Sequence, residues 1–219
     1  MWCIGKLTEE YRRRMYGLLE LYAKPYSEEE PVVCVDEKSK QLLQQARTPL
    51  VAKPGKPVKE DYEYRRAGTR NIFMAVEPKA GCRQVEVTAR RTKVDFVRFI
   101  SRLVEKVYAG AQKIHLVMDN LNTHFTNSFI EVLGIEHAEQ MLKRVEFHYT
   151  PKHASWLNMA EIEIGIMDRQ CIGHRLGSET VLRSEVAAWE SRRNLIKARI
   201  EWKFTRQDAD QKLSKYYVS

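Results

Sequence analysis

Two short stretches decide the fold: Pro31-Val-Val-Cys-Val-Asp36 and Lys113-Ile-His-Leu-Val-Met-Asp119. Each is a continuous apolar run that ends on an aspartate, a pattern typical of strands buried on both faces of a sheet. Functional groups gather where such strands end, because the loops there present polar side chains over a rigid platform. If the two strands are parallel neighbours, the carboxylates of Asp36 and Asp119 converge.

The remaining patterns predict a mixed α/β sheet of five strands flanked by helices. Strands are indicated by short apolar or alternating runs, and helices by apolar residues at helical spacing. The predicted order is helix, three strands, helix, strand, helix, strand, helices, in which antiparallel strands precede βαβ crossovers. Besides the two opening strands, the predicted strands are Asn71–Glu77, Arg83–Ala89 and Val145–Tyr149, and the predicted helices are Thr8–Ala23, Lys93–Tyr108, about 127–142, one from near Asn158, and a mostly helical tail over Glu179–Tyr217.

Three parts are expected along the chain. Residues 1–30 are predicted to be an N-terminal helix and linker, residues 31–178 the α/β core, and residues 179–219 C-terminal helices that pack on the core. Within the core, Pro and Gly residues interrupt a segment rich in Lys and Arg. This composition predicts an extended basic loop at about 44–70.

The composition is that of a folded domain with a basic surface. The chain has 219 residues and a formal net charge of +8, from 37 Lys and Arg against 29 Asp and Glu. Such a surface favours polyanions, and phosphate neutralisation supplies most non-specific affinity for nucleic acid. No apolar run approaches the roughly 20 residues of a membrane span, no secretory signal is recognisable, and the four cysteines lack zinc-site spacing. We therefore expect a cytoplasmic protein without a membrane partner.

Converging carboxylates have a specific chemical use. They repel one another unless a cation lies between them, and Mg²⁺ prefers such oxygen ligands. Two ions about 3.5–4 Å apart can stabilise both the attacking and the leaving oxygen of a phosphoryl transfer. The competing interpretation is that each aspartate caps a turn after its strand. The shared pattern at Asp36 and Asp119 favours the metal site.

A third acid is less certain from the residues alone. Asn158-Met-Ala-Glu161 also fits a capping box, in which Asn158 caps a helix and Glu161 reaches back to it. Glu163 is a second candidate ligand, but on a helix it points about 200° away from Glu161. Spacing does not decide which of the two faces the aspartates.

Several ordered motifs resemble one protein family. The stretch Tyr149-Thr-Pro-Lys-His-Ala-Ser-Trp-Leu-Asn-Met-Ala-Glu161 is similar to the signature of bacterial insertion-sequence transposases of the six-thirty family, relatives of the Tc/mariner transposases in the DDE superfamily. The resemblance runs from about Trp2 to the end of the chain. Its other motifs are Val35-Asp36-Glu37-Lys-Ser-Lys-Gln41, Asp61-Tyr-Glu-Tyr-Arg-Arg-Ala-Gly-Thr69, Met118-Asp119-Asn-Leu-Asn-Thr-His124 and Trp202-Lys-Phe-Thr-Arg-Gln-Asp-Ala209.

This resemblance implies a fold, a site and an activity. It implies a ribonuclease-H-like fold in which Asp36, Asp119 and Glu161 hold two Mg²⁺ ions, with Mn²⁺ as a substitute. Family members cleave DNA at transposon ends with water, and the freed 3′-hydroxyl then attacks target DNA, typically at a TA dinucleotide. The resemblance also implies a homodimer associated with the nucleoid. The helix-turn-helix modules usual in such transposases have no counterpart before Trp2, so we expect a catalytic domain alone.

Basic residues of the predicted loop, and a few residues near Asp119 and before Glu161, are candidate contacts to DNA. For each, the alternative is an ordinary solvated or structural role. Trp156 is expected to anchor the core, since an aromatic residue in an apolar turn usually packs. Two rival functions stay open: a ribonuclease-H-like nuclease without strand transfer, and an inactive remnant that binds DNA without cutting it. The candidate contacts are Lys53, Lys56, Arg65, Arg66, Arg70, His124, Lys152 and His153.

Overall fold

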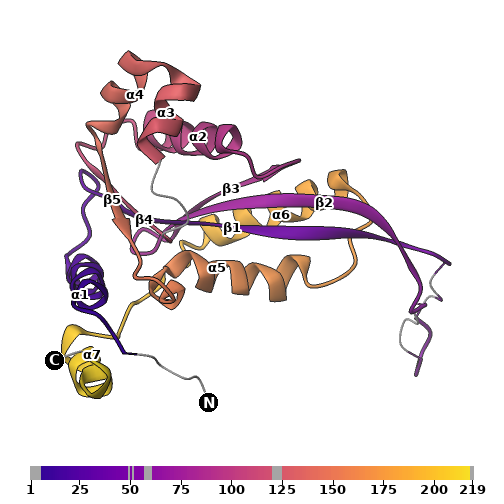
Figure 1. Ribbon diagram of the computed structural model, residues 1–219. Coiled ribbons are helices and arrows are strands. Elements are labelled where there is room, and N and C mark those ends of the chain that lie inside the picture. The colour runs from indigo at the N-terminus through magenta and orange to yellow at the C-terminus, as the bar shows by residue number, and fades with distance from the viewer. Residues whose placement is uncertain (1–5, 49, 51, 57–60, 120–124, 218–219) are drawn as a thin grey trace.

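A single mixed sheet organises the protein. The computed structural model describes residues 6–48, 50, 52–56, 61–119 and 125–217. Five strands lie in the order β3-β2-β1-β4-β5, with β1, β2 and β3 antiparallel and β4 and β5 parallel to β1. Helices cover both faces (Figure 1). The chain therefore has the predicted α/β class. The strands are β1 (Val32–Gln45), β2 (Tyr64–Glu77), β3 (Cys82–Thr88), β4 (Ile114–Met118) and β5 (Val145–Tyr149).

The first two strands are much longer than their apolar patterns predict. They form a hairpin that projects far beyond the other strands (Figure 1). The basic loop expected at about 44–70 is therefore wrong at both ends, because Gln44 and Gln45 belong to β1 and Tyr64 to Arg70 pairs with it. The outer half of β2 is largely exposed and polar, whereas its inner half is buried. Backbone pairing, which leaves no periodic apolar signal, extends the hairpin outward.

One face of the sheet is covered by three helices: α2 (Lys93–Arg102), α3 (Phe125–Leu133) and α4 (Ile135–Leu142). Val33, Val35 and Leu116 point to this face and pack against α2 and its continuation, the π turn Leu103–Val107. The single helix predicted over 127–142 is in fact two. They are separated at Gly134, whose φ of 83° lies in the left-handed region that favours glycine.

The opposite face packs against α1, α5 and α6, and α7 joins it at the end of the chain (Figure 1). Cys34 and Val117 lie in this second core, and Trp189 of α6 packs beside β2 and β3. Trp156 is not the buried anchor that we expected. It is 41 % exposed and stacks on Trp202. The bounds are α1 (Glu9–Ala23), α5 (Met159–Met167), followed by the π turn Asp168–Ile172, α6 (Glu179–Leu195) and α7 (Arg206–Leu213).

A buried acid at the end of β2 makes stability depend on pH. Glu77 is 6 % exposed, and burial raises its pKa to about 7. A carboxyl whose pKa rises on folding binds a proton more tightly in the folded state. The free energy of unfolding therefore falls as the pH rises from the pKa of Glu77 in the unfolded chain toward its folded pKa of about 7. The Tyr108 hydroxyl donates a hydrogen bond that offsets part of this cost.

We predict that Glu77→Gln stabilises the protein more at pH 8 than at pH 5. The neutral amide avoids the buried charge, so the gain in free energy of unfolding should be larger by about 1–2 kcal/mol at the higher pH. Urea unfolding of both proteins at both pH values measures the difference. The same gain at pH 5 and pH 8 would contradict it.

Candidate active site

The two aspartates of the opening motifs lie on adjacent parallel strands. Cys34 of β1 is opposite Val117 of β4, so Asp36 and Asp119 follow two residues beyond the same paired position. Side chains alternate along a strand. Asp36 therefore faces the same side of the sheet as Cys34, toward α5. Asp119 comes directly after β4 and is half-buried.

A buried asparagine brings Glu161 to this strand end. The Asn158 carboxamide accepts a hydrogen bond from the Ala160 N–H at 3.1 Å, which caps α5. Its Nδ2 donates to the Val35 carbonyl at 2.9 Å, one residue before Asp36. The first turn of α5, which carries Glu161, is thus held against β1. The Asn158 N–H donates to the Ser155 carbonyl at 2.7 Å, so a capping box does not occupy Glu161.

The charges of the three acids influence one another. The pKa of Asp36 is raised to about 7, chiefly by burial and in part by the charges of Asp119, Glu37 and Glu161, while a hydrogen bond from the Glu37 N–H acts in the opposite direction. Burial raises the pKa of Asp119 to about 6, with the charges of Glu37 and Glu161 adding to the effect. A cation placed among these groups would relieve both the burial and the repulsion.

The acids are nevertheless not packed as the ligands of one ion. Among the described residues, the group whose possible ligand atoms all lie within 4.8 Å of one another is His115, Glu146 and His148. Asp36, Asp119 and Glu161 are spaced more widely than that. A centre for two ions about 3.5–4 Å apart does not require that all its carboxylates meet at one point.

Glu163, the alternative third acid, is committed elsewhere. Its side chain is fully buried, and its Oε1 and Oε2 accept hydrogen bonds from Arg83 at 2.7 and 3.2 Å and from Arg193 at 2.9 and 3.1 Å. Both carboxylate oxygens are thus occupied by guanidinium groups that join α5 to β3 and α6. This geometry removes Glu163 as a metal ligand.

One ion pair near the acids was not anticipated from the sequence. Arg91 binds Glu37 at 2.9 Å, and its charge lowers the pKa of Asp119. Glu37 follows Asp36 directly, and by strand alternation it projects from the other face of the sheet. No sequence pattern links it to Arg91, because the two residues meet only after β1, β2 and β3 have paired.

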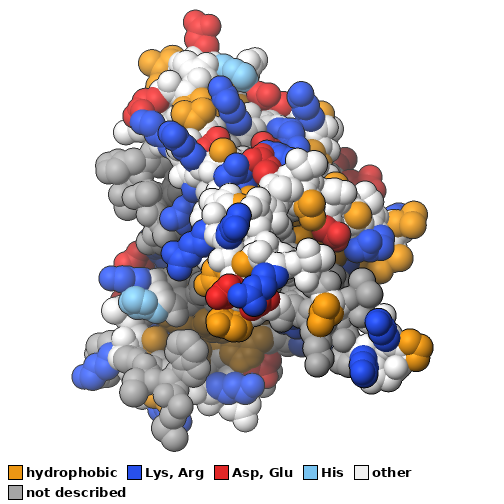
Figure 2. All heavy atoms as spheres, turned by 90° about the vertical axis from the view of Figure 1, so that its right-hand side faces the viewer, with side chains coloured by type: hydrophobic (Ala, Val, Ile, Leu, Met, Phe, Trp, Pro, Cys, Tyr) orange, Lys and Arg blue, Asp and Glu red, His pale blue; other side chains and the backbone are white. Residues whose placement is uncertain are grey.

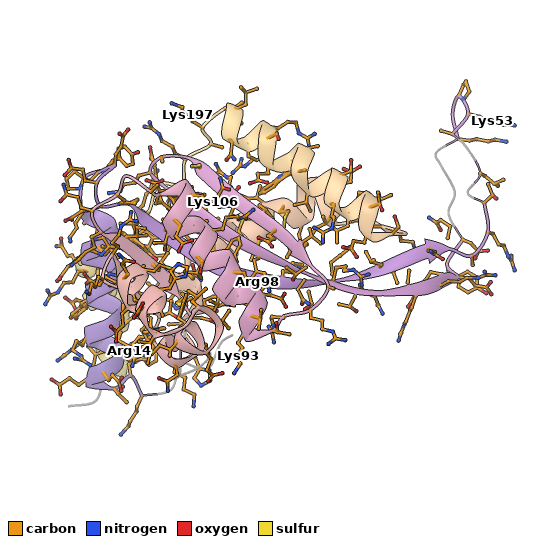
Figure 3. All side chains as sticks on the ribbon, turned by 90° about the horizontal axis from the view of Figure 1, so that it is seen from above. Arg14, Lys53, Lys93, Arg98, Lys106 and Lys197 are labelled. Carbon is orange, nitrogen blue, oxygen red and sulfur yellow. The ribbon has the colours of Figure 1, made fainter. Side chains whose placement is uncertain are left out.

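The candidate DNA contacts fall in two places. Lys53 and Lys56 are exposed in the loop of the hairpin (Figure 3), and Arg65 and Arg66 are exposed on β2. Figure 2 shows Lys and Arg side chains spread over the face from which this hairpin projects. Arg70 is less available, because it binds Glu179 of α6.

The other candidates lie beside the acids in sequence. Lys152 and His153 are exposed in the turn before α5, and His153 has a left-handed φ of 63°. His124, also proposed from the sequence, lies outside the described residues.

Comparison with known proteins places the chain in a family. The model of the DDE superfamily endonuclease domain matches residues 31–183, which span the five strands and α5. The chain therefore belongs to the DDE superfamily endonuclease family. No curated protein matches it in sequence. The narrower resemblance to the six-thirty family stays a prediction.

Solved structures show the same fold. The Mos1 mariner paired-end complex with Mn is matched at a TM-score of 0.55 and 14% identity, over 99% of this chain and 63% of that chain. The paired-end complex with Mg gives 0.57 and 12%, over 100% and 66%, and the Mos1 strand transfer complex gives 0.54 and 14%, over 99% and 62%. The ribonuclease-H-like fold is confirmed. The chain spans slightly less than two thirds of these relatives. No helix among the described residues is long and apolar enough to cross a membrane.

Replacing each of the two glutamates of α5 by glutamine in turn should show that Glu163 stabilises the fold and that Glu161 does not. Glu163→Gln leaves the buried guanidinium of Arg83 and the partly buried guanidinium of Arg193 without their counter-charge, so we expect a loss of about 3–5 kcal/mol in the free energy of unfolding. Glu161→Gln alters an exposed side chain and should change it by less than about 0.5 kcal/mol. Denaturant unfolding of the two variants gives both values. Equal losses would contradict the geometry described for α5.

Proposed function

We propose that this chain is the catalytic domain of a transposase that cleaves DNA at transposon ends and joins the freed 3′-hydroxyl to target DNA. The observation that carries the proposal is the convergence of Asp36, Asp119 and Glu161 at one strand end, where their charges act on one another. Membership of the DDE endonuclease family and the fold shared with Mos1 transposase complexes support it.

The donor set fits divalent metal. Three carboxylates supply the hard oxygen ligands that Mg²⁺ and Mn²⁺ prefer. The raised pKa values of Asp36 and Asp119 mean that the ionised form of each is disfavoured in the fold, and a bound cation would reverse this. We assign Asp36, Asp119 and Glu161 as ligands of two Mg²⁺ ions, with Mn²⁺ able to replace them. Such ions, when bound, activate the attacking water or hydroxyl and offset charge in the transition state.

The chain's own residues would position these ligands. The buried carboxamide of Asn158 fixes the first turn of α5 relative to Val35, so the Glu161 backbone is set relative to Asp36. Arg91 holds Glu37 on the far side of β1 and offsets part of the negative charge near Asp119.

DNA is the proposed partner. Lys53, Lys56, Arg65 and Arg66 are exposed along the hairpin and would contact phosphates, with Arg70 secondary because of its pairing with Glu179. Lys152 and His153, next to the helix that carries Glu161, would contact the strand being cut. We further propose that the DNA substrates are transposon ends and a TA-containing target. The working form would be a homodimer, located in the cytoplasm at the nucleoid. The basic charge of the chain supports the DNA partner.

A matched set of variants tests the catalytic assignment. Asp119→Asn and Glu161→Gln should each lower Mg²⁺-dependent nicking of DNA by about 100-fold or more, because a lost ligand weakens transition-state stabilisation. Glu139→Gln, which alters an exposed acid of α4, is the control and should cut as the unmodified chain does. Equal cutting by all four proteins would remove the assignment.

The unmodified chain and the Asp119→Asn variant also distinguish a transposase from the two rival functions, a nuclease without strand transfer and an inactive DNA-binding remnant. A pre-cleaved transposon end with a free 3′-hydroxyl is offered together with target DNA and Mn²⁺. A transposase joins the two, whereas a ribonuclease-H-like nuclease only cuts, and an inactive remnant only binds. Joined product that disappears in Asp119→Asn supports the proposal, and cutting without any joined product would replace it by the nuclease.

The salt dependence of DNA binding tests whether the hairpin contacts DNA phosphates. Replacing Lys53 and Lys56 together by Ala should weaken binding to duplexes of any sequence and reduce the slope of log Kd against log salt by about 2, roughly one unit for each phosphate that is no longer neutralised. Fluorescence anisotropy over a salt series measures the slope. Lys106→Ala with Lys143→Ala, two exposed lysines elsewhere, should leave the slope unchanged. An unchanged slope in the hairpin variant would exclude this interaction with DNA.

A further inference from the structure

A second group of ligand-type side chains lies on the parallel strands β4 and β5. His115 of β4 is in register with Glu146 of β5, and His148 lies two residues further along β5. Side chains two residues apart on a strand share a face. Phe147, between Glu146 and His148, packs into the opposite core with α3 and α4. The three polar side chains therefore project together on the face toward α1.

Their spacing suits a single metal ion. His115 Nδ1 and His148 Nε2 are 2.9 Å apart, His148 Nε2 and a Glu146 oxygen 3.4 Å, and His115 Nδ1 and the other Glu146 oxygen 3.8 Å. Tetrahedral ligands at about 2.0–2.1 Å from zinc lie about 3.3 Å from one another. The two Glu146 separations run to different carboxylate oxygens, so the three distances do not describe one triangle. One ligand atom from each of the three residues nevertheless lies within 4.8 Å of the other two, so small side-chain movements would bring three ligand atoms to the distances that zinc requires.

The outer contacts orient these ligands as metal sites require. Lys113 Nζ donates to Glu146 Oε2 at 3.0 Å and leaves Oε1 toward His148. On the far side of the His115 ring, Nε2 lies 3.8 Å from a carboxylate oxygen of Glu30. A metal-bound histidine usually gives its other N–H to a carboxylate, which fixes the tautomer and the ring orientation.

An unsatisfied atom points to a missing partner. His115 is 4 % exposed, and its Nε2 is buried without a hydrogen-bond partner among the described residues. Without metal, Nδ1 is shared with His148, and the tautomer of His115 is undetermined. An ion on Nδ1 would place the proton on Nε2, and a small movement of the half-exposed Glu30 side chain would bring an acceptor to it.

Space for the ion and its water is present. A cavity of about 420 Å³ lies between the three side chains and α1, and Gly17, Glu20, Leu21 and Lys24 form its helical wall. A fourth coordination position facing this cavity can be taken by water, as in open three-ligand zinc sites.

This group is separate from the acids at the strand end. His115 precedes Asp119 by four residues along β4, which is roughly 13 Å of extended chain. The ligand chemistry differs too, because imidazole nitrogen selects Zn²⁺ and similar transition metals, whereas the all-carboxylate set selects Mg²⁺ or Mn²⁺.

We propose that His115, Glu146 and His148 form a binding site for a divalent transition-metal ion, with Zn²⁺ as the best match, and that Glu30 supports His115 from behind. The site joins the edge strand β5 to β4 and, through Glu30, to the segment that leads from α1 into β1. It is a stabilising site on the flank of the fold, independent of the proposed reaction.

Binding is measured on the full chain after treatment with a chelator. Zn²⁺ at about 100 times its Kd should raise Tm by about 5–10 °C, while Mg²⁺ at the same concentration should not. Co²⁺ should give the visible absorption of a four-coordinate site. His148→Ala and Glu146→Gln should each weaken Zn²⁺ affinity, measured by calorimetry, by at least about tenfold.

Two controls locate the ion. His137→Ala removes an exposed histidine that pairs with Glu105 on the other face, and it should keep full Zn²⁺ affinity. Asp119→Asn should also keep it, because the acids at the strand end are not ligands of this ion. Far-UV circular dichroism checks that His148→Ala is folded, and Glu146→Gln, which alters a half-exposed side chain, provides the second variant.

Three results would overturn the proposal. One is the absence of any Zn²⁺-dependent rise in Tm for the unmodified chain. Another is an unchanged Zn²⁺ affinity in folded His148→Ala and Glu146→Gln, which would mean that the ion binds elsewhere. The third is loss of Zn²⁺ binding in Asp119→Asn, which would place the ion at the acids.

Discussion

The side chain of Asn158 ties the two halves of the candidate site together. One carboxamide both caps α5, through the Ala160 N–H, and binds the backbone of β1 at Val35. Asn158 is fully buried, so these hydrogen bonds form away from competing water. These hydrogen bonds act together with the apolar packing of Met159 and Ala160 against Cys34, and they set the first turn of α5, which carries Glu161, against the strand that carries Asp36. The pairing of β1 with β4 places Asp119 beside Asp36, and the charges of the three acids then act on one another.

Much of the fold could be predicted because its signals are local. The apolar runs before Asp36 and Asp119 indicate central strands, and the alternation at Arg83–Ala89 indicates β3, the edge strand that pairs with β2. Whether the two aspartate strands are parallel neighbours stayed a condition in the sequence, and the structure shows that they are. The outer hairpin could not be predicted in this way, because its strands are held by backbone pairing and expose polar side chains that resemble a loop.

The candidate site shows a similar division. A strand-terminal position is visible in the sequence for both aspartates, but the choice between Glu161 and Glu163 depended on a family resemblance. The structure supplies the physical reason, because Arg83 and Arg193 occupy Glu163 and come from β3 and α6. Contacts between residues so distant in the chain leave no local pattern. The pair of Arg91 with Glu37 and the group around His115 were missed for the same reason.

The projecting hairpin and the core differ in how many substitutions and insertions they can tolerate. Leu42 is the last buried side chain of β1, and the residues of β2 before Asn71 contribute little to any core. Substitutions, insertions or a shorter tip there would alter few buried contacts, so the cost to folding would be small. Related chains can therefore diverge in reach and charge at this tip while the strand ends that carry the aspartates stay as they are.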